Sequence, residues 1–139
     1  MDKELRKEYM AELRDDFDVD EMAEILDNID LEATDFQIGN FRFIHQDNID
    51  QILIDELSLD THMLGCFTAW FIADITGISV EAVEKAQKAD SYEVLGELML
   101  QKIELVAENY VASDSYGRHF ASYDGDENMV KDYYYFRNN

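Results

Sequence analysis

The spacing of apolar residues predicts three amphipathic helices in the N-terminal half of the chain. Residues 2–14, 20–30 and 48–57 each place apolar side chains three or four positions apart, as on one face of a helix. The opposite face of the second helix carries about one carboxylate per turn, at Asp20, Glu24 and Asp27. We therefore expect this helix to bury one face and to present acids to solvent on the other.

Two longer stretches predict further helices. Residues 61–76 are apolar nearly all round, which predicts a central buried helix that contains Trp70 and is capped by Gly77. Residues 91–112 predict the last helix. Small residues recur four apart in the central helix and would let another helix approach closely, namely Gly65, Ala69 and Ala73.

Alternating apolar and polar residues predict a small amount of β structure. Residues 36–44 read as a strand that Gly39-Asn40 interrupts with a turn or a bulge. Residues 119–123 and 133–137 read as two more strands. In the last of these, the run of three tyrosines from Tyr133 is expected to have one face in the core and one exposed, with core packing favoured over a contact surface.

These elements predict an α+β fold that is mostly α. Its core would be helical and built around the helix at 61–76, with the β element near 36–44 and 119–137. The chain contains no proline, no linker rich in serine or glycine and no internal repeat. Residues 1–139 are therefore expected to form a single domain with a strongly acidic N-terminal half.

Charge changes the picture more than any other property. The net charge is −21, and between Asp15 and Asp35 the chain places ten carboxylates without a lysine or arginine. The charges of such a run repel one another and are expected to gain nothing from ion pairing within the chain, so the run calls for solvation or a cationic partner. The candidate partner-binding residues are Asp15, Asp16, Asp18, Asp20, Glu21, Glu24, Asp27, Asp30, Glu32 and Asp35, followed by Asp47, Asp50, Asp55 and Glu56.

No residue pattern predicts catalysis, a metal or a cofactor. Cys66 and His62 lie four apart, but two ligands without a third do not define a metal site. The segments 16–20 and 124–128 alternate oxygen ligands like the start of a calcium loop, yet both lack the required glycine and glutamate, so a helix cap or a turn explains them. The histidines have no nucleophile motif beside them, and no phosphate-binding loop is present. The protein is therefore expected not to be an enzyme.

Composition also limits location and partners. A single cysteine fits a reducing cytoplasm, the N-terminus has no apolar signal segment, and the longest apolar stretch is too short to span a bilayer. An acidic chain without a basic stripe is repelled by nucleic acid and by anionic membranes, so direct binding to either is not expected. The expected partner is a basic, nucleic-acid-binding protein or complex in the cytoplasm, and a homodimer is left open.

One segment resembles a known family. The stretch 109–118, with Tyr116-Gly117-Arg118 at its end and an aromatic tail after it, resembles the C-terminal part of ArdA-type antirestriction proteins. In that family a Tyr-Gly-Arg or Tyr-Ala-Arg sequence follows a helix and precedes the terminal strands. The resemblance covers about a quarter of the chain and implies an acidic DNA mimic that inhibits type I restriction enzymes. The family has a longer, multi-domain body, and the N-terminal hundred residues here do not resemble it.

The acidic and proline-free composition also resembles phage-encoded inhibitors of host defence more widely, anti-CRISPR proteins included. The function expected from charge and resemblance together is a non-enzymatic nucleic-acid mimic that occupies the DNA- or RNA-binding site of a defence complex. The alternative is a helical adaptor that binds another basic protein without mimicry. A small enzyme ranks third.

Overall fold

The computed structural model describes all 139 residues of the chain, which form two compact units. We call residues 1–49 and 114–139 the sheet unit, and residues 50–113 the helical unit. The sheet unit is thus made of two separate segments of sequence, between which the helical unit is inserted. The expectation of a single domain over 1–139 stays a prediction.

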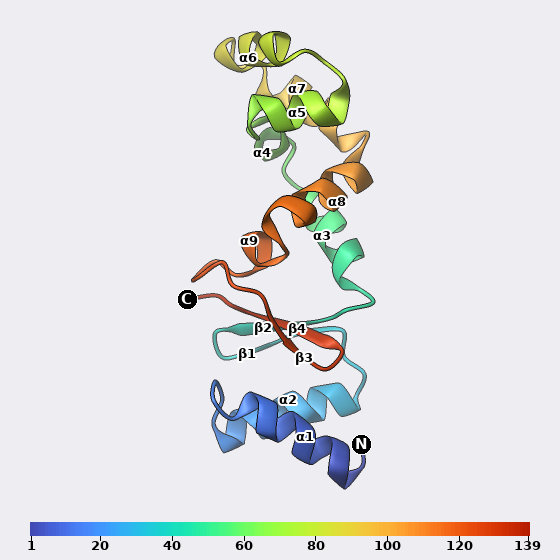
Figure 1. Ribbon diagram of the computed structural model, residues 1–139, viewed down its shortest axis with the longest axis vertical. Coiled ribbons are helices and arrows are strands. Elements are labelled where there is room, and N and C mark those ends of the chain that lie inside the picture. Colours follow the sequence, from blue (N-terminus) through green and yellow to red (C-terminus); the bar gives the residue numbers. More distant parts are fainter. The chain divides into compact units, whose positions relative to one another are not determined.

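The sheet unit combines a four-stranded sheet with three helices. Its elements are α1 (Lys3–Leu13), α2 (Val19–Asp30), β1 (Asp35–Ile38), β2 (Phe41–His45), α9 (Gly117–Phe120), β3 (Asn128–Val130) and β4 (Tyr133–Arg137). The strand order is β1-β2-β4-β3, and every neighbouring pair is antiparallel. The helices α1 and α2 cover one face of this sheet (Figure 1). The predicted α+β fold, mostly α, is confirmed.

Residues 36–44, which the sequence predicts as one strand interrupted by a turn or a bulge, lie in two antiparallel strands of a hairpin, β1 and β2. Gly39 lies in the turn with a φ of 58°, a left-handed conformation that glycine adopts without steric cost. Across the hairpin, the Arg42 guanidinium donates two hydrogen bonds to Asp35, Nε to Oδ1 at 2.9 Å and Nη2 to Oδ2 at 2.7 Å. The predicted turn at Gly39-Asn40 is therefore confirmed.

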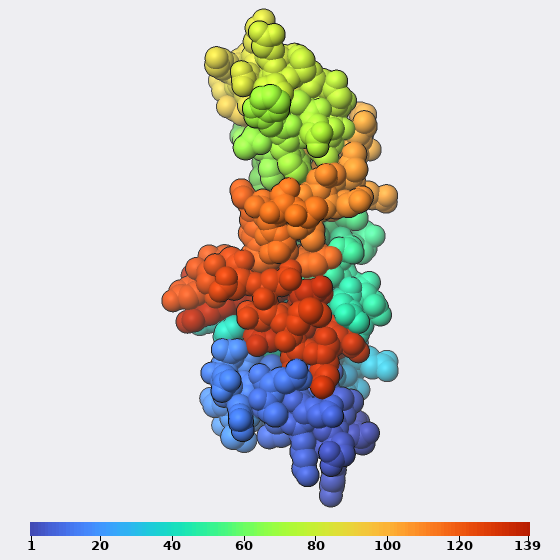
Figure 2. All heavy atoms as spheres, in the orientation of Figure 1, coloured from blue at the N-terminus to red at the C-terminus, as the bar shows by residue number.

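The two central strands join segments that are far apart in sequence. Phe43 of β2 lies opposite Tyr135 of β4, and their rings stack with centroids 5.3 Å apart. Because successive strand residues point to opposite faces, Tyr133 and Tyr135 are buried beside α1 and α2 while Tyr134 packs with Tyr116 on the other face. In Figure 2 the N-terminal helices, in blue, lie directly against the C-terminal segment, in red. The expected core packing of Tyr133 and Tyr135 is confirmed, whereas Tyr134 is half-buried rather than exposed.

A cluster of buried side chains fills the space between the helices and the sheet. Its members come from α1, α2, the turn between them and all four strands: Tyr9, Leu13, Phe17, Met22, Ile25, Leu26, Ile38, Phe43, Val130, Tyr133 and Tyr135. The stripe predicted for α2 is part of this cluster, so α2 buries its apolar face and leaves its acidic face to solvent. On the other face of the sheet, Phe120 of α9 packs on Phe136, with ring centroids 5.2 Å apart.

The helical unit contains only helices and their connections. Its elements are α4 (Thr61–Gly65), α5 (Ala69–Thr76), α6 (Val80–Lys88) and α7 (Tyr92–Leu100), together with most of α3 (Ile49–Leu57) and α8 (Ile103–Asp114). The chain ends α5 at Gly77, whose φ of 79° is left-handed, as the sequence predicts. Ser79 caps α6 by accepting a hydrogen bond from the Ala82 N–H at 3.2 Å.

The closest helix contact in this unit depends on two glycines. A Cβ atom added to Gly65 of α4 would overlap the carbonyl oxygen of Tyr92, and one added to Gly96 of α7 would overlap that of Thr61. Close approach at Gly65 is therefore confirmed. The second small residue of this contact is Gly96 of α7, and not the predicted Ala69 or Ala73 further along the chain from Gly65.

The prediction of one central buried helix over 61–76 is wrong. Residues 66–68 separate α4 from α5, because the Thr68 Oγ1 accepts a hydrogen bond from the Phe71 N–H at 3.3 Å and starts a new helix. Cys66 is exposed at the end of α4. Trp70 is also exposed, with 75% of its surface open to solvent. Because this run is apolar on every side, its pattern does not show which residues face the core. It therefore gives no sign of where one helix ends and the next begins.

Two more expectations need correction. The helix predicted over 91–112 is divided into α7 and α8 by a turn at Gln101-Lys102, where no proline or glycine marks the break. Residues 119–123 do not form a strand, because 117–120 form the short helix α9. The third strand lies later, at 128–130, where it pairs with β4.

Candidate interaction surface

The acidic helix α2 is held rigidly at its start by two of its own acids. The Asp18 Oδ1 accepts a hydrogen bond from the Glu21 N–H at 2.8 Å, and the Glu21 Oε1 accepts one from the Asp18 N–H at 3.0 Å. This reciprocal capping box satisfies two N–H groups that the helix leaves unpaired. Asp18 therefore serves as a helix cap, as the alternative to a calcium loop predicts.

Five acids of the Asp15–Asp35 run have no partner within the chain. Their side chains make neither a hydrogen bond nor an ion pair, and all five are exposed: Asp15, Asp20, Glu24, Asp27 and Glu32. Three of them follow one another along α2 at about one per turn, which spaces their carboxylates about 4.5 to 6 Å apart along the helix axis. We call Asp20, Glu24 and Asp27 the α2 acid row.

The other five acids of the run are occupied, which corrects the expectation that the run gains nothing from pairing. Besides the capping pair, Asp16 accepts a hydrogen bond from the Tyr135 hydroxyl at 3.0 Å. Asp30 lies 3.2 Å from the Met1 ammonium group and 3.8 Å from Arg6. Asp35 pairs with Arg42. The cations come from outside the run, from segments that the fold brings to it.

The second predicted group of acids is divided between the two units. Asp47 belongs to the sheet unit, where its carboxylate lies 3.8 Å from the His45 Nδ1. Asp50, Asp55 and Glu56 belong to the helical unit. Asp55 accepts a hydrogen bond from the Gln51 Nε2 at 2.8 Å. Asp47 is therefore the one member of this group that shares a unit with the Asp15–Asp35 run.

A pocket of 380 Å³ lies at the end of the sheet where β2 finishes and the β3–β4 turn begins. We call it the acidic pocket. It is lined by Tyr9, Ile29, Glu32, Thr34, His45, Asp47, Asn48, Asp132 and Tyr133. The sequence indicated Glu32 and Asp47, but it did not indicate Tyr9 or Asp132. Only the pairing of β2 with β4 brings these residues together, and no local pattern reports that pairing.

Three buried phenols in this unit have raised pKa values. Burial is the main cause of the raised pKa of Tyr135, and its hydrogen bond to Asp16 adds to the effect. Burial also raises the pKa of Tyr9, followed by the charge of Asp132, and it is the first cause of the raised pKa of Tyr133. All three phenols therefore stay protonated well above neutral pH.

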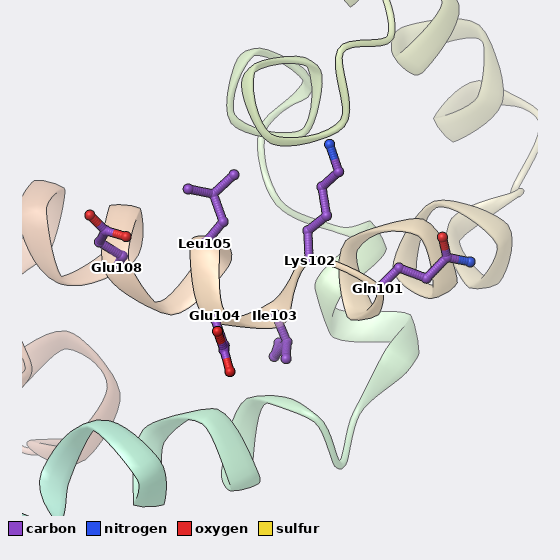
Figure 3. A pocket seen from close by; sticks show the side chains of 6 residues that line it. All are labelled: Gln101, Lys102, Ile103, Glu104, Leu105 and Glu108. Atoms are coloured by element: carbon purple, nitrogen blue, oxygen red, sulfur yellow. The ribbon is translucent and has the colours of Figure 1, made fainter.

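The helical unit has a pocket that is larger than the acidic pocket, but the side chains that line it point in different directions. It measures 460 Å³ and lies at the junction of α7 and α8, lined by Gln101, Lys102, Ile103, Glu104, Leu105 and Glu108 (Figure 3). Figure 3 shows Lys102 and Leu105 pointing to one side of the backbone, whereas Ile103 and Glu104 point to the other. Because the polar groups do not converge on one point, the arrangement lacks the geometry of a catalytic site.

The candidate ligands noted in the sequence do not gather. No group of three or more His, Cys, Asp or Glu side chains is placed to hold a metal ion. The His62 Nδ1 lies 3.5 Å from the Glu93 Oε1. The Asp124 Oδ1 accepts a hydrogen bond from the Asp126 N–H at 2.9 Å and closes a turn. No helix has both the length and the apolar content that crossing a bilayer requires.

Comparison of the chain with protein-family models, with curated proteins and with solved structures found no match. The resemblance of 109–118 to ArdA-type proteins therefore stays a prediction. In the structure, Tyr116-Gly117-Arg118 follows α8, begins α9 and precedes β3.

Proposed function

We propose that this protein is a non-enzymatic inhibitor that presents carboxylates in place of phosphates and occupies the nucleic-acid-binding site of a basic protein or complex. The observation that carries the proposal is the α2 acid row. Asp20, Glu24 and Asp27 are exposed and unpaired on a helix whose start is fixed by a capping box and whose other face is buried. The helix that carries these three acids is therefore held in place before a partner binds.

The charge density of one helix is lower than that of DNA. Duplex DNA carries about one negative charge per 1.7 Å of its axis, whereas the α2 acid row offers one per turn of about 5.4 Å. The exposed acids Asp15 and Glu32 flank the row and add to the local negative field. Steering of a basic partner depends on this summed field rather than on a match of single charges.

The expected target is a nucleic-acid-binding defence complex of the restriction or CRISPR type, as the resemblance to antirestriction proteins implies. A type I restriction enzyme is the probe of choice. We expect the protein to inhibit its cleavage of DNA, and excess DNA to relieve that inhibition. Binding should weaken steeply as salt rises, because exposed charges are screened.

The decisive variant neutralises the row, with Asp20→Asn, Glu24→Gln and Asp27→Asn combined. Its matched control removes the same charge from exposed positions of the helical unit, with Glu81→Gln, Glu84→Gln and Glu97→Gln combined. The row variant should bind the enzyme more slowly than the control does, as measured by surface plasmon resonance. Equal association rates for the two variants would contradict the proposal, and so would direct binding of duplex DNA by the protein itself.

A second candidate function is that of a helical adaptor for another basic protein, without mimicry of nucleic acid. It is favoured by Trp70, which exposes 75% of its surface on α5. Large exposed aromatic side chains are enriched among residues that dominate protein interfaces. An adaptor of this kind would lose its partner in Trp70→Ala, would keep it in the row variant, and would not be displaced by DNA.

A further inference from the structure

The acidic pocket is assembled by backbone hydrogen bonds between segments that are distant in sequence. The His45 N–H donates to the Thr34 carbonyl at 2.8 Å, and the Gln46 N–H donates to the Asp132 carbonyl at 2.8 Å. The first bond holds the α2–β1 connection against the end of β2. The second holds the β3–β4 turn against the same end. The walls of the pocket are therefore fixed by the sheet itself.

The lining of this pocket contains three carboxylates and neither lysine nor arginine. Glu32, Asp47 and Asp132 are all exposed. The Asp47 N–H donates a hydrogen bond to the His45 Nδ1 at 3.1 Å. Lys131, next to Asp132, is directed to α1, where its ammonium lies 3.1 Å from Glu8 and 3.5 Å from Glu12.

The side chain of Tyr9 is the second observation that indicates a ligand. Its surface is only 4% exposed, its ring packs in the core, and its hydroxyl has no hydrogen-bond partner. The Arg137 Nε is the one fully buried side-chain polar atom that lacks a partner, so the Tyr9 hydroxyl keeps a small opening to solvent. Tyr9 is one of the residues that line the acidic pocket.

The second phenol of the pocket is already oriented. The Tyr133 hydroxyl donates to the Ala33 carbonyl at 2.7 Å, which leaves its oxygen lone pairs as acceptors. Its ring meets the His45 ring edge to face, with centroids 5.0 Å apart. The pocket thus combines carboxylate acceptors, phenol oxygens and aromatic surface.

We propose that the acidic pocket binds the guanidinium group of an arginine side chain supplied by the basic partner. The source of the arginine rests on the proposed function, whereas the recognition rests on the pocket alone. A guanidinium offers five N–H donors in one plane, which suits acceptors spread over several walls better than the three donors of an ammonium. It is also more weakly hydrated and packs well against aromatic rings.

The test is an NMR titration of the isotope-labelled protein with a capped Gly-Arg-Gly peptide. We expect saturable shifts of the backbone amides of His45, Gln46 and Asp132. The same peptide with citrulline in place of arginine keeps the shape and loses the charge, and it should cause no saturable shift. The peptide with lysine should bind more weakly than the one with arginine.

Three variants assign the binding to this pocket. Glu32→Gln combined with Asp47→Asn should weaken arginine binding by roughly tenfold or more, because each change removes a charged acceptor. Tyr9→Phe keeps the packed ring and removes only the hydroxyl, so binding should weaken without loss of the native amide spectrum. The control Glu81→Gln removes a charge from an exposed position of the helical unit, outside the pocket lining, and should leave the affinity nearly unchanged.

Several results would overturn the inference. These are equal binding of the citrulline peptide, binding of lysine as tight as that of arginine, and unchanged affinity in the Glu32→Gln, Asp47→Asn variant. The titration uses only the isolated protein and a peptide, so a negative result would exclude arginine binding by the acidic pocket. The proposed function would still be tested separately, by the competition with DNA.

Discussion

At the C-terminal ends of α2 and α6, a charged residue occupies the left-handed position that glycine usually takes. Glu32 has a φ of 58° and Asp90 a φ of 59°. In both motifs the left-handed residue and the one after it donate their N–H groups to the last turn, as Asp90 does to Gln87 and Ser91 to Ala86. A side chain with a Cβ is strained in this conformation by about 1 kcal/mol.

Asp90→Gly should therefore raise the free energy of unfolding by up to about 1 kcal/mol, since glycine adopts this conformation freely. Urea unfolding followed by circular dichroism measures the change. Gly77→Ala is the matched control at the end of α5, where φ is 79° and the space around the glycine is open. It should destabilise the protein by a similar amount. A loss of stability in Asp90→Gly would contradict the strain argument.

The buried phenol of Tyr135 gives stability a dependence on alkaline pH. Its pKa is raised in the folded protein by burial and by the bond to Asp16, so the folded state holds the proton more tightly than the unfolded state does. The stabilisation is complete below the unfolded pKa of about 10 and is lost as the pH rises further. We expect the free energy of unfolding to fall between about pH 9 and pH 11.

Tyr135→Phe tests this origin. At about pH 8 it should cost about 1 kcal/mol, because the hydrogen bond to Asp16 is lost. The same variant should lose less stability than the wild type on going to alkaline pH. Parallel pH profiles for the two proteins would show that other groups, such as Tyr9 and Tyr133, cause the alkaline loss.

Among the elements, α4 and α7 make a contact that tolerates no side chain at the crossing. Gly65 and Gly96 each bring a helix backbone against a carbonyl group of the other helix. A single methyl group at this point cannot be accommodated by a rotamer change, because the atom that it would meet belongs to the backbone. The helices would have to separate.

Gly96→Ala should accordingly destabilise the protein by about 3 kcal/mol or more, at the upper end of the cost of overpacking. Thermal unfolding by calorimetry measures the loss. Glu97→Ala, one position further along α7 and exposed, should change the stability by less than about 0.5 kcal/mol. A mild effect of Gly96→Ala would mean that the two helices can shift apart cheaply.

Whether an element can be predicted from the sequence depends on how far apart along the chain the interacting residues that define it lie. The apolar stripe of α2 and the turn at Gly39-Asn40 depend on residues that are close together in the sequence, and both predictions are confirmed. The break at Thr68 was missed because a cap inside an apolar run looks like an interruption of one helix. The acidic pocket was missed because Asp132 meets Tyr9 only through strand pairing, which no local pattern encodes. The exposed α2 acid row was predicted from periodicity alone.

For the whole molecule, the net charge of −21 opposes compaction. Only a minority of the acids have cationic partners, and Lys131 is shared between Glu8 and Glu12. Added salt shortens the range of the repulsion from about 30 Å at 10 mM to about 10 Å at 100 mM. The folded state should gain more from this screening than the expanded unfolded chain does.

We therefore expect the melting temperature to rise with sodium chloride over this range. Differential scanning calorimetry measures it, and the row variant with three fewer charges should show a smaller rise. The same scans test the single-domain prediction, because one cooperative transition supports it and two separate transitions contradict it. A melting temperature that falls with salt would mean that ion pairs outweigh repulsion in this fold.

The insertion of the helical unit between two parts of the sheet unit has a consequence for synthesis on the ribosome. The strand β2 leaves the ribosome early, but its neighbour β4 is translated only after residues 50–113. Until then, the apolar sides of α2 and of the β1–β2 hairpin have no completed sheet to cover them. The helical unit is contiguous and can fold first. For most of translation, the acidic N-terminal part of the sheet unit is therefore present without its remaining strands. The charge repulsion that lowers the stability of the finished protein should keep these segments of neighbouring nascent chains apart and so oppose aggregation.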